Sequence, residues 1–369
     1  MRNRPLILFV SLFMMSVPLR AQGTAKDITI PMKSDRLDVR SFVLSEMVES
    51  VKYIRIDDSS TLGNIIDIKF WDGCFYLQDS SHQTIAVVNG DGKIVSIISH
   101  RGRASNEYIS LQAYAIGKTD GSVYIFDNSG MKIVVYSKTG AFIRSIPLSE
   151  DLAAFRDIEI TPRGTVLLYN PLWIENIFDA LVELDASGKK LRTLFENDKK
   201  HQLAIAHVPS DYFSVMSDGS ITLMGREDRD LFYRLSPDGK FTSSYHMATD
   251  VTIPSELKKK VNLTSEEMKA ENYYQKMFYQ ETDNWLCFAL RYQRKTKYCF
   301  YNKKKEKQYV IKSTKDIQDP FETQLTRYKR GSGPYLLSVL SNPGSDAYKR
   351  AVSEVPPGDN PIIVIAKTR

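Results

Sequence analysis

The densest group of side chains able to do chemistry lies between positions 100 and 108, which read His-Arg-Gly-Arg-Ala-Ser-Asn-Glu-Tyr. Arg101, Arg103 and Glu107 offer charged donors and an acceptor to a polar ligand, and Tyr108 offers a ring face for stacking. The alternative is structural, because a segment between two sheets must satisfy its own backbone polar groups, and these side chains can do so. We favour the structural interpretation and keep the binding one open.

Further binding candidates lie elsewhere in long connections. Trp173 lies in the connection 171–180, and His201 and His207 follow the basic pair at 199–200, where they can form an anion-binding edge. A solvated loop is the plainer interpretation of that basic segment. The complete set of predicted binding residues is His100, Arg101, Arg103, Glu107, Tyr108, Trp173, His201 and His207.

Signals for catalysis are weak throughout the chain. The histidines and cysteines lack the HExxH or CxxC spacing of metal sites. There is no glycine-rich phosphate loop, and Gly331-Ser332-Gly333 resembles a G-x-S-x-G nucleophile turn only superficially. We therefore predict no metal and no cofactor, and we leave open whether the protein is an enzyme.

The elements that must position these residues repeat along the chain. Matched positions are Tyr76 and Tyr124, Asp79 and Asp127, Ile85 and Ile133, and Gly92 and Gly140, each pair 48 residues apart (124 − 76 = 48). A period of roughly 40–50 residues with several strand-like runs per unit is typical of propeller blades. Units of this kind span 65–99, 114–147, 156–195, 212–246 and 274–311.

The last unit is incomplete, with strands predicted only at 322–329, 335–340 and 361–366. An otherwise unpaired strand at 51–56 completes it if the two ends of the chain pair, which removes open sheet edges. The prediction is an all-β fold, a single six-bladed β-propeller closed by pairing of an N-terminal strand with the C-terminal blade. Two short helices interrupt it, one opened by the capping box at 264–267 and running to about Lys276, the other at 345–354.

The long connections of this predicted propeller gather at one end. The turns between the first and second strands of each unit, and between the third and fourth, are short and mostly contain glycine. The insertions all belong to the opposite end and span 100–112, 171–180, 196–208, 247–273 and 341–360. Because loops on a rigid scaffold often carry function, we expect a ligand at this loop-rich end.

The N-terminal segment 1–22 has the pattern of an export signal, with Arg2 and Arg4 before an apolar run over 6–17. That run is shorter than the roughly 20 residues that span a bilayer, and no cysteine follows it. We predict an exported protein of the periplasm or the extracellular space, with one domain over 23–369 and no membrane anchor. Losing Arg2, Arg4 and Arg20 lowers the net charge from +6 to +3 (6 − 3), too little to indicate nucleic-acid binding.

The chain has three cysteines, Cys74, Cys287 and Cys299. Export permits disulfides, and Cys287 and Cys299 could face each other across a hairpin centred on Gln293. We favour buried free thiols instead, because cysteine is among the most buried residue types.

Together these stretches resemble an exported bacterial six-bladed β-propeller family of unassigned function, related in blade pattern to NHL-type propellers. The resemblance rests on the strand at 50–56, the repeated Tyr-x-x-Asp and Ile-x-Val patterns, the crossover from Gly102 to Tyr108, and the ending 360–367. The family crossover usually runs Gly-x-Gly-Pro-Gly-Glu-Tyr, and this chain has Ala104-Ser105-Asn106 in its centre. The resemblance implies the fold and export, and it implies no reaction.

The leading functional hypothesis is a monomeric binding module that holds a glycan, a peptide or a protein partner at the loop-rich end. The alternative is a propeller enzyme with its site at the channel mouth, either a metal-assisted lactonase-like hydrolase or a polysaccharide-acting enzyme. A third hypothesis is a protein–protein scaffold in which the insertion 247–273 is the docking element.

Overall fold

The computed structural model describes residues 25–33, 41–171, 179–196, 212–225, 230–251, 254–258, 260, 266, 274–319 and 330–369. The predicted export signal lies outside the described residues, as do Trp173, His201 and His207. In the described parts, β-strands dominate and the helices are few and short.

Four separate antiparallel sheets of four strands each follow the predicted units. Their strands are β4 (Ile65–Trp71), β5 (Cys74–Asp79), β6 (Thr84–Asn89) and β7 (Ile94–Ile98); β8 (Ala113–Ile116), β9 (Val123–Asp127), β10 (Lys132–Tyr136) and β11 (Phe142–Pro147); β12 (Asp157–Ile160), β13 (Val166–Tyr169), β14 (Asp179–Leu184) and β15 (Lys190–Glu196); and β20 (Tyr274–Glu281), β21 (Trp285–Tyr292), β22 (Lys295–Asn302) and β23 (Lys307–Ile311).

The other long strands form one nine-stranded sheet in the order β1-β19-β18-β17-β16-β25-β26-β27-β3. Their bounds are β1 (Lys26–Ile30), β3 (Val48–Arg55), β16 (Phe213–Val215), β17 (Ile221–Met224), β18 (Leu231–Leu235), β19 (Phe241–Thr249), β25 (Arg330–Ser332), β26 (Tyr335–Leu340) and β27 (Ile362–Thr368). The prediction of six separate blades is therefore wrong: within the described residues, four four-stranded sheets stand alone. The physical reason is a parallel bridge between Val215 and Ser332, beside which the Gly333 amide donates to the Val215 carbonyl at 2.7 Å.

The strand predicted at 51–56 finds its partner at the other end of the chain. β3 pairs antiparallel with β27, in a register that runs from Arg55 opposite Ile362 to Val48 opposite Thr368. Gly92, in the turn between β6 and β7, holds the segment that follows β3. Its carbonyl oxygen accepts from the Asp57 amide at 2.9 Å. Gly92 has φ +88°, and a Cβ there would lie 1.9 Å from the Arg55 carbonyl oxygen, so only glycine fits this approach.

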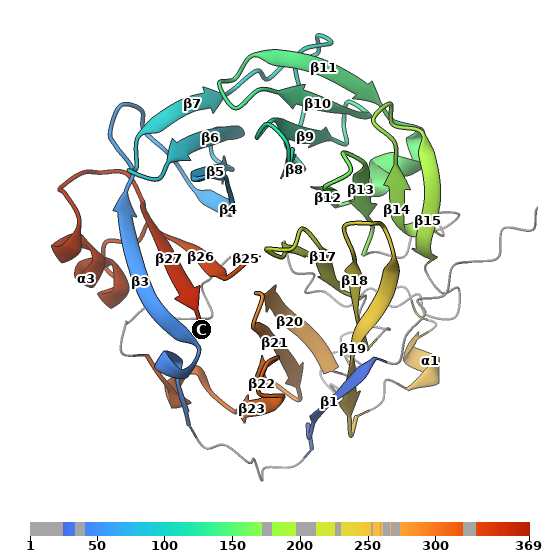
Figure 1. Cartoon of the computed structure of the whole chain (residues 1–369), viewed down its shortest axis with the longest axis vertical. Helices are drawn as coiled ribbons and strands as arrows, with labels where there is room; N and C mark the ends of the chain where they lie inside the picture. The colour runs from blue at the N-terminus through green and yellow to red at the C-terminus, as the bar shows by residue number, and fades with distance from the viewer. Residues whose placement is uncertain are drawn as a thin grey trace, which may run out of the picture.

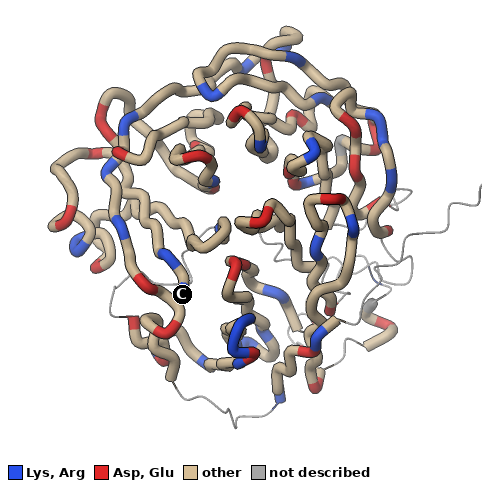
Figure 2. The backbone as a smooth tube through the Cα atoms, viewed as in Figure 1, with Lys and Arg blue, Asp and Glu red and all other residues tan. Residues whose placement is uncertain are grey.

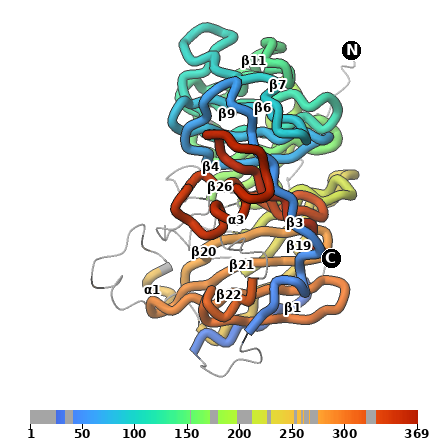
Figure 3. The backbone as a smooth tube through the Cα atoms, turned by 90° about the vertical axis from the view of Figure 1, so that its left-hand side faces the viewer, coloured from blue at the N-terminus to red at the C-terminus, as the bar shows by residue number. Residues whose placement is uncertain are grey.

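The sheets are arranged around a common centre, with β4, β8, β12, β20 and β25 on the inside and β7, β11, β15 and β3 on the outside (Figure 1). This is a propeller-like arrangement. The view turned by 90° shows the sheets following one another along the long axis, with β1 against β19 and near β22 (Figure 3). Lys26 of β1 also pairs with Glu306 at 2.6 Å, so the first strand links two neighbouring sheets.

Short elements complete the fold. They are β2 (Phe42–Val43), β24 (Ile317–Gln318), η1 (Leu44–Glu46), η2 (Glu150–Ala154), η3 (Thr314–Asp316), α1 (Ser255–Lys258) and α3 (Asp346–Glu354). The helix predicted at 345–354 is confirmed as α3, whose N-cap Ser345 accepts from the Tyr348 amide. The helix predicted to run to Lys276 is wrong at its end, because Tyr274–Glu281 pairs with β21 as strand β20.

The hydrophobic core lies mainly between neighbouring sheets. One cluster, for example, joins Phe126 and Val135 of the second sheet to Leu168 of the third. Cys287 and Cys299 are free and buried in different clusters, on opposite faces of their sheet, so they cannot form a disulfide. The prediction of buried free thiols is confirmed for these two residues.

Candidate binding site at the centre of the fold

A pocket of about 270 Å³ lies at the inner strands. Its lining includes the turn residues Asp72, Lys118, Gly219 and Pro334, so it opens at the end where the first strand of each unit turns into the second. This is the end with the short turns. The pocket is thus at the opposite end from the loop-rich surface where the sequence analysis expected a ligand.

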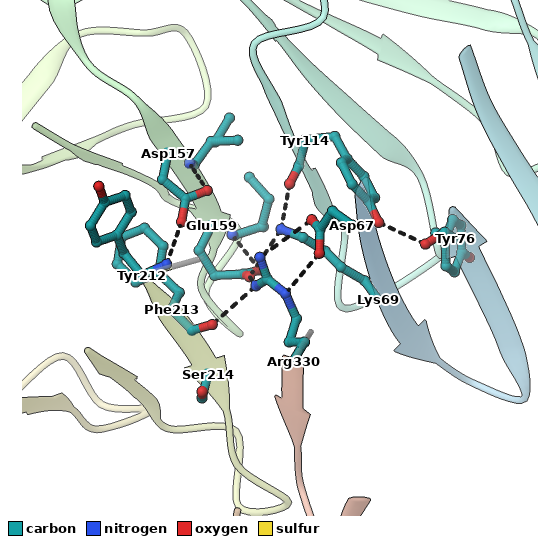
Figure 4. Close-up of polar contacts among 12 residues, drawn as sticks. Asp67, Lys69, Tyr76, Tyr114, Asp157, Glu159, Tyr212, Phe213, Ser214 and Arg330 are labelled. Atoms are coloured by element: carbon teal, nitrogen blue, oxygen red, sulfur yellow. Dashed lines mark hydrogen bonds and ion pairs between the residues drawn. The ribbon is translucent and has the colours of Figure 1, made fainter. Parts of the chain in front are cut away.

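Six charged side chains form a network at this pocket, and they come from separate sheets. Asp67 and Lys69 belong to β4, Lys118 follows β8, Asp157 and Glu159 belong to β12, and Arg330 begins β25. Figure 2 shows charged positions on the inner strands as well as at the periphery. Figure 4 shows Asp67, Lys69, Glu159 and Arg330 converging, with Asp157 to one side, bonded to the Tyr212 amide. Asp67 and Glu159 form ion pairs with the three bases, as expected for buried charges. Asp157 accepts from the Ile158 and Tyr212 amides at 2.8 and 3.1 Å.

Glu159 lies at the middle of the network, and its side chain is 1% exposed. Its Oε1 accepts from Lys118 Nζ and from the Ile160 amide, each at 3.0 Å. Its Oε2 lies 3.6 Å from Lys69 Nζ and 3.8 Å from Arg330 Nη1. These are ion-pair distances but too long for good hydrogen bonds. Within the described structure Oε2 has no hydrogen-bond partner, so a buried acceptor at the pocket is left unsatisfied.

The other cations are held in place by separate partners. Arg330 contacts both carboxylate oxygens of Asp67, at 3.3 and 3.4 Å, and its Nη1 donates to the Phe213 carbonyl at 3.0 Å. Lys69 Nζ donates to the Tyr114 carbonyl. Because these contacts orient Arg330 and Lys69, the positive charge around Glu159 Oε2 is fixed by the fold itself (Figure 4).

The network shifts the pKa values of its members in different directions. Burial works against ionisation of Glu159, yet Lys118, Lys69 and Arg330 lower its pKa to about 2. Burial lowers the pKa of Lys118, and the neighbouring Glu159 opposes that shift. Burial also raises the pKa of Asp157, against the effects of Lys69 and Arg330. Glu159 therefore stays ionised at neutral pH.

Aromatic rings form one wall of the pocket. Phe70, Trp71 and Tyr335 line it, with Phe70 and Tyr335 edge to face at 5.8 Å between centroids. Lys118 Nζ lies 5.5 Å from the Trp71 ring centroid, which favours a cation–π contact. A few placed polar groups beside apolar walls are the usual make-up of a small-ligand site.

Alternation along the inner strands explains this placement. Asp67 and Lys69 are two residues apart, as are Asp157 and Glu159, so each pair projects from one face of its strand. The sequence analysis predicted both strands but missed these residues. The available signal was a pair of charges, two residues apart, inside an otherwise apolar strand.

The crossover 100–108 has a structural role in the described contacts. Tyr108 is fully buried, and its hydroxyl donates to the Gln83 carbonyl at 2.6 Å, so its ring is not available as the expected stacking face. Glu107 Oε2 accepts from the Ala104 amide at 2.9 Å. His100 stacks on Tyr136 with centroids 5.1 Å apart. These contacts satisfy the segment's polar groups and join the first two sheets.

Arg101 and Arg103 of the same crossover are exposed. None of the described candidates, from His100 to Tyr108, lines the pocket. In the described part of the chain, no group of three or more His, Cys, Asp or Glu side chains is placed to hold a metal ion.

Antiparallel sheets around a common centre, with a pocket lined by charged and aromatic side chains among their inner strands, define a propeller-like protein. The family profile described as "Domain of unknown function (DUF4934)" matches residues 27–367, and the chain belongs to this family of unknown function.

Two solved structures are similar to the chain. A putative exported protein from Bacteroides fragilis has 15% identity and a TM-score of 0.69, with 94% of this chain and 100% of that chain covered. A DUF4221 family member from Bacteroides vulgatus has 10% identity and a TM-score of 0.51, with 88% and 98% covered. At these identities the likeness concerns the fold alone. No curated protein matches the sequence.

Within the described residues, no helix has both the length and the apolar character needed to span a membrane.

Proposed function

We propose that this protein is an exported binding module that takes one small polar ligand into the central pocket. The observation that carries the proposal is Glu159, a residue that lines the pocket and whose buried Oε2 has no hydrogen bond in the described structure. Leaving a buried acceptor unpaired costs about 1–3 kcal/mol, which a ligand donor or a water molecule recovers. The likeness to a putative exported protein supports the proposed location.

The proposed scaffold is one domain over 23–369, a propeller with an NHL-like blade pattern. Within its nine-stranded sheet, strands β16 to β19 and β25-β26-β27-β3 touch through the Val215–Ser332 bridge. The β3–β27 pairing then closes the ring. Hydrogen exchange tests this: if the ring is closed, the β3 amides exchange only on global unfolding. Exchange of β3 well before β27 would contradict closure.

The binding proposal is tested by blocking the pocket. Ser332 lines the pocket, and Ser332→Trp places an indole there. Ser187→Trp is the matched control, because Ser187 is exposed on the turn between β14 and β15 and is outside the lining. Both variants and the wild type are screened by thermal shift against a panel of monosaccharides, carboxylic acids, amino acids and dipeptides.

We expect at least one compound of the panel to stabilise the wild type and the Ser187→Trp variant but not the Ser332→Trp variant. Stabilisation of all three proteins by the same compounds would place binding elsewhere and overturn the proposal. The absence of any stabilising compound would also count against it.

A further inference from the structure

We propose that the ligand in the central pocket is a sugar, bound through one ring. This inference rests on the proposed function and narrows it to a substrate class. It starts from the close pair formed by Lys118 Nζ and the Glu159 carboxylate, 3.0 Å apart at the pocket.

A sugar hydroxyl matches this pair because it both donates and accepts. It can donate to Glu159 Oε2, which has no hydrogen bond in the described structure, and accept from Lys118, whose ammonium group has three N–H donors. Two neighbouring hydroxyls on one ring can use both side chains at once. The contact satisfies the carboxylate oxygen and leaves the existing bond from Lys118 to Oε1 in place.

The charges of the pocket disfavour a cationic ligand. A ligand ammonium would approach Lys69, Lys118 and Arg330 within the same small, partly desolvated site, which is costly. A ligand carboxylate would approach these three cations as well as the ionised Glu159, so carboxylic acids are the competing class that the binding experiments include. A neutral polyol needs no counter-charge and keeps the hydrogen bonds.

The shape of the pocket agrees with one ring. A volume of about 270 Å³ corresponds to about nine water molecules at their liquid volume of about 30 Å³. That accommodates one sugar ring. The C–H face of a sugar is apolar and can pack on the aromatic wall of Phe70, Trp71 and Tyr335 while the hydroxyls face Lys118 and Glu159.

The pocket also opens to solvent next to the exposed Asp72. The remainder of a longer glycan can therefore continue outward from the bound ring. The inference concerns a terminal sugar unit, whether free or at the end of a chain.

Saturation-transfer NMR with individual hexoses, 6-deoxyhexoses and N-acetylhexosamines tests the inference on the full mature chain. Titration calorimetry then compares the wild type with Lys118→Met and with the matched control Lys189→Met, which lies on the exposed β14–β15 turn. Hydrogen bonds to charged groups contribute about 1.5–3 kcal/mol, so we expect binding to the Lys118→Met variant to be weaker by about tenfold or more. The control should bind like the wild type, and thermal unfolding checks that both variants fold.

Three results would overturn the inference. The first is the absence of saturation transfer to every sugar, and the second is equal sugar affinity in both lysine variants. The third is stabilisation by amino acids or carboxylic acids only, with loss of that effect in Ser332→Trp. The third result would retain a binding module with this pocket and reject only the sugar.

Discussion

Two buried glutamates in this fold have opposite relations to their surroundings. Glu183 on β14 is fully satisfied: Oε1 accepts from Arg163 at 2.5 Å and from Thr165 at 2.6 Å, and Oε2 accepts from Arg192 at 2.7 Å. Glu159 on β12 is equally buried, but only its Oε1 is hydrogen-bonded.

The partners differ as well. Arg163 and Arg192 are 40% and 32% exposed, so they reach solvent beside Glu183. Lys69 and Arg330 are 6% and 4% exposed, so the charges near Glu159 depend on one another. The difference is that Glu183 uses both its oxygens in hydrogen bonds within the protein, whereas Glu159, which lines the pocket, leaves Oε2 without one.

The largest expected effect is on stability when each glutamate loses its charge. Glu159→Gln leaves Lys69, Lys118 and Arg330 buried with one fewer counter-charge, so we expect a loss of about 3–5 kcal/mol in the free energy of unfolding. Glu183→Gln should cost about 1 kcal/mol, because its arginines can turn to solvent. Urea denaturation at neutral pH measures both. Equal losses of unfolding free energy in the two variants would mean that the cations around Glu159 depend on its charge no more than the arginines around Glu183 do.

A second effect concerns acid. The pKa of Glu159 falls from 4.5 to about 2 in the folded protein, so its ionisation stabilises the fold above about pH 4.5. That contribution, about 3 kcal/mol, is lost as pH falls through about 2. The stability gap between wild type and Glu159→Gln should therefore narrow by about that amount from pH 5 to pH 2 in urea titrations.

Burial raises the pKa of Asp157, so the contribution of Asp157 to stability changes with pH in the opposite direction. Because Asp157 is present in both proteins, this contribution cancels when their free energies of unfolding are subtracted. A gap that stays constant with pH would show that Glu159 does not titrate as the network predicts.

A smaller effect is expected for Lys118→Met. Glu159 loses one partner but keeps the Ile160 amide, and a cation whose pKa is lowered by burial is removed. These changes oppose each other, so stability should stay within about 1 kcal/mol of the wild type in urea denaturation. A loss as large as that of Glu159→Gln would identify Lys118 as a structural residue.

The smallest effect is expected for Arg103→Ala in the crossover. Arg103 is exposed and outside the pocket lining, so stability should change by no more than about 0.5 kcal/mol. Affinity for any ligand of the central pocket, measured by calorimetry, should be unchanged. A marked loss of affinity would instead favour a binding site at the loop-rich end.

Much of the fold could be predicted from the sequence, because period and turn chemistry are local patterns. The repeated Tyr-x-x-Asp pattern, for example, ends in Asp127, which accepts amide hydrogen bonds from Ile109 and Ser110 and so anchors the segment that leads into β8. The β3–β27 pairing was predictable because one strand lacked a neighbour and one unit lacked a strand. The Val215–Ser332 bridge was not, since one residue pair leaves no pattern.

The candidate site was less predictable, for a related reason. Loop lengths can be read along the chain, and they predicted a ligand at the loop-rich end. The central network needs Lys69, Glu159 and Arg330 from three strands far apart in sequence. Only the arrangement of the sheets shows that these strands face the same space.

The pairing of β3 with β27 also affects the order of events during synthesis. Ile54 lies opposite Ile363, so the two residues are separated by 309 positions (363 − 54 = 309). A ribosome delivers β3 among the earliest strands and its neighbour among the last. The early strand must therefore remain without that partner, and exposed to wrong ones, until translation is almost finished. Assistance that keeps nascent chains apart should improve the yield of native protein.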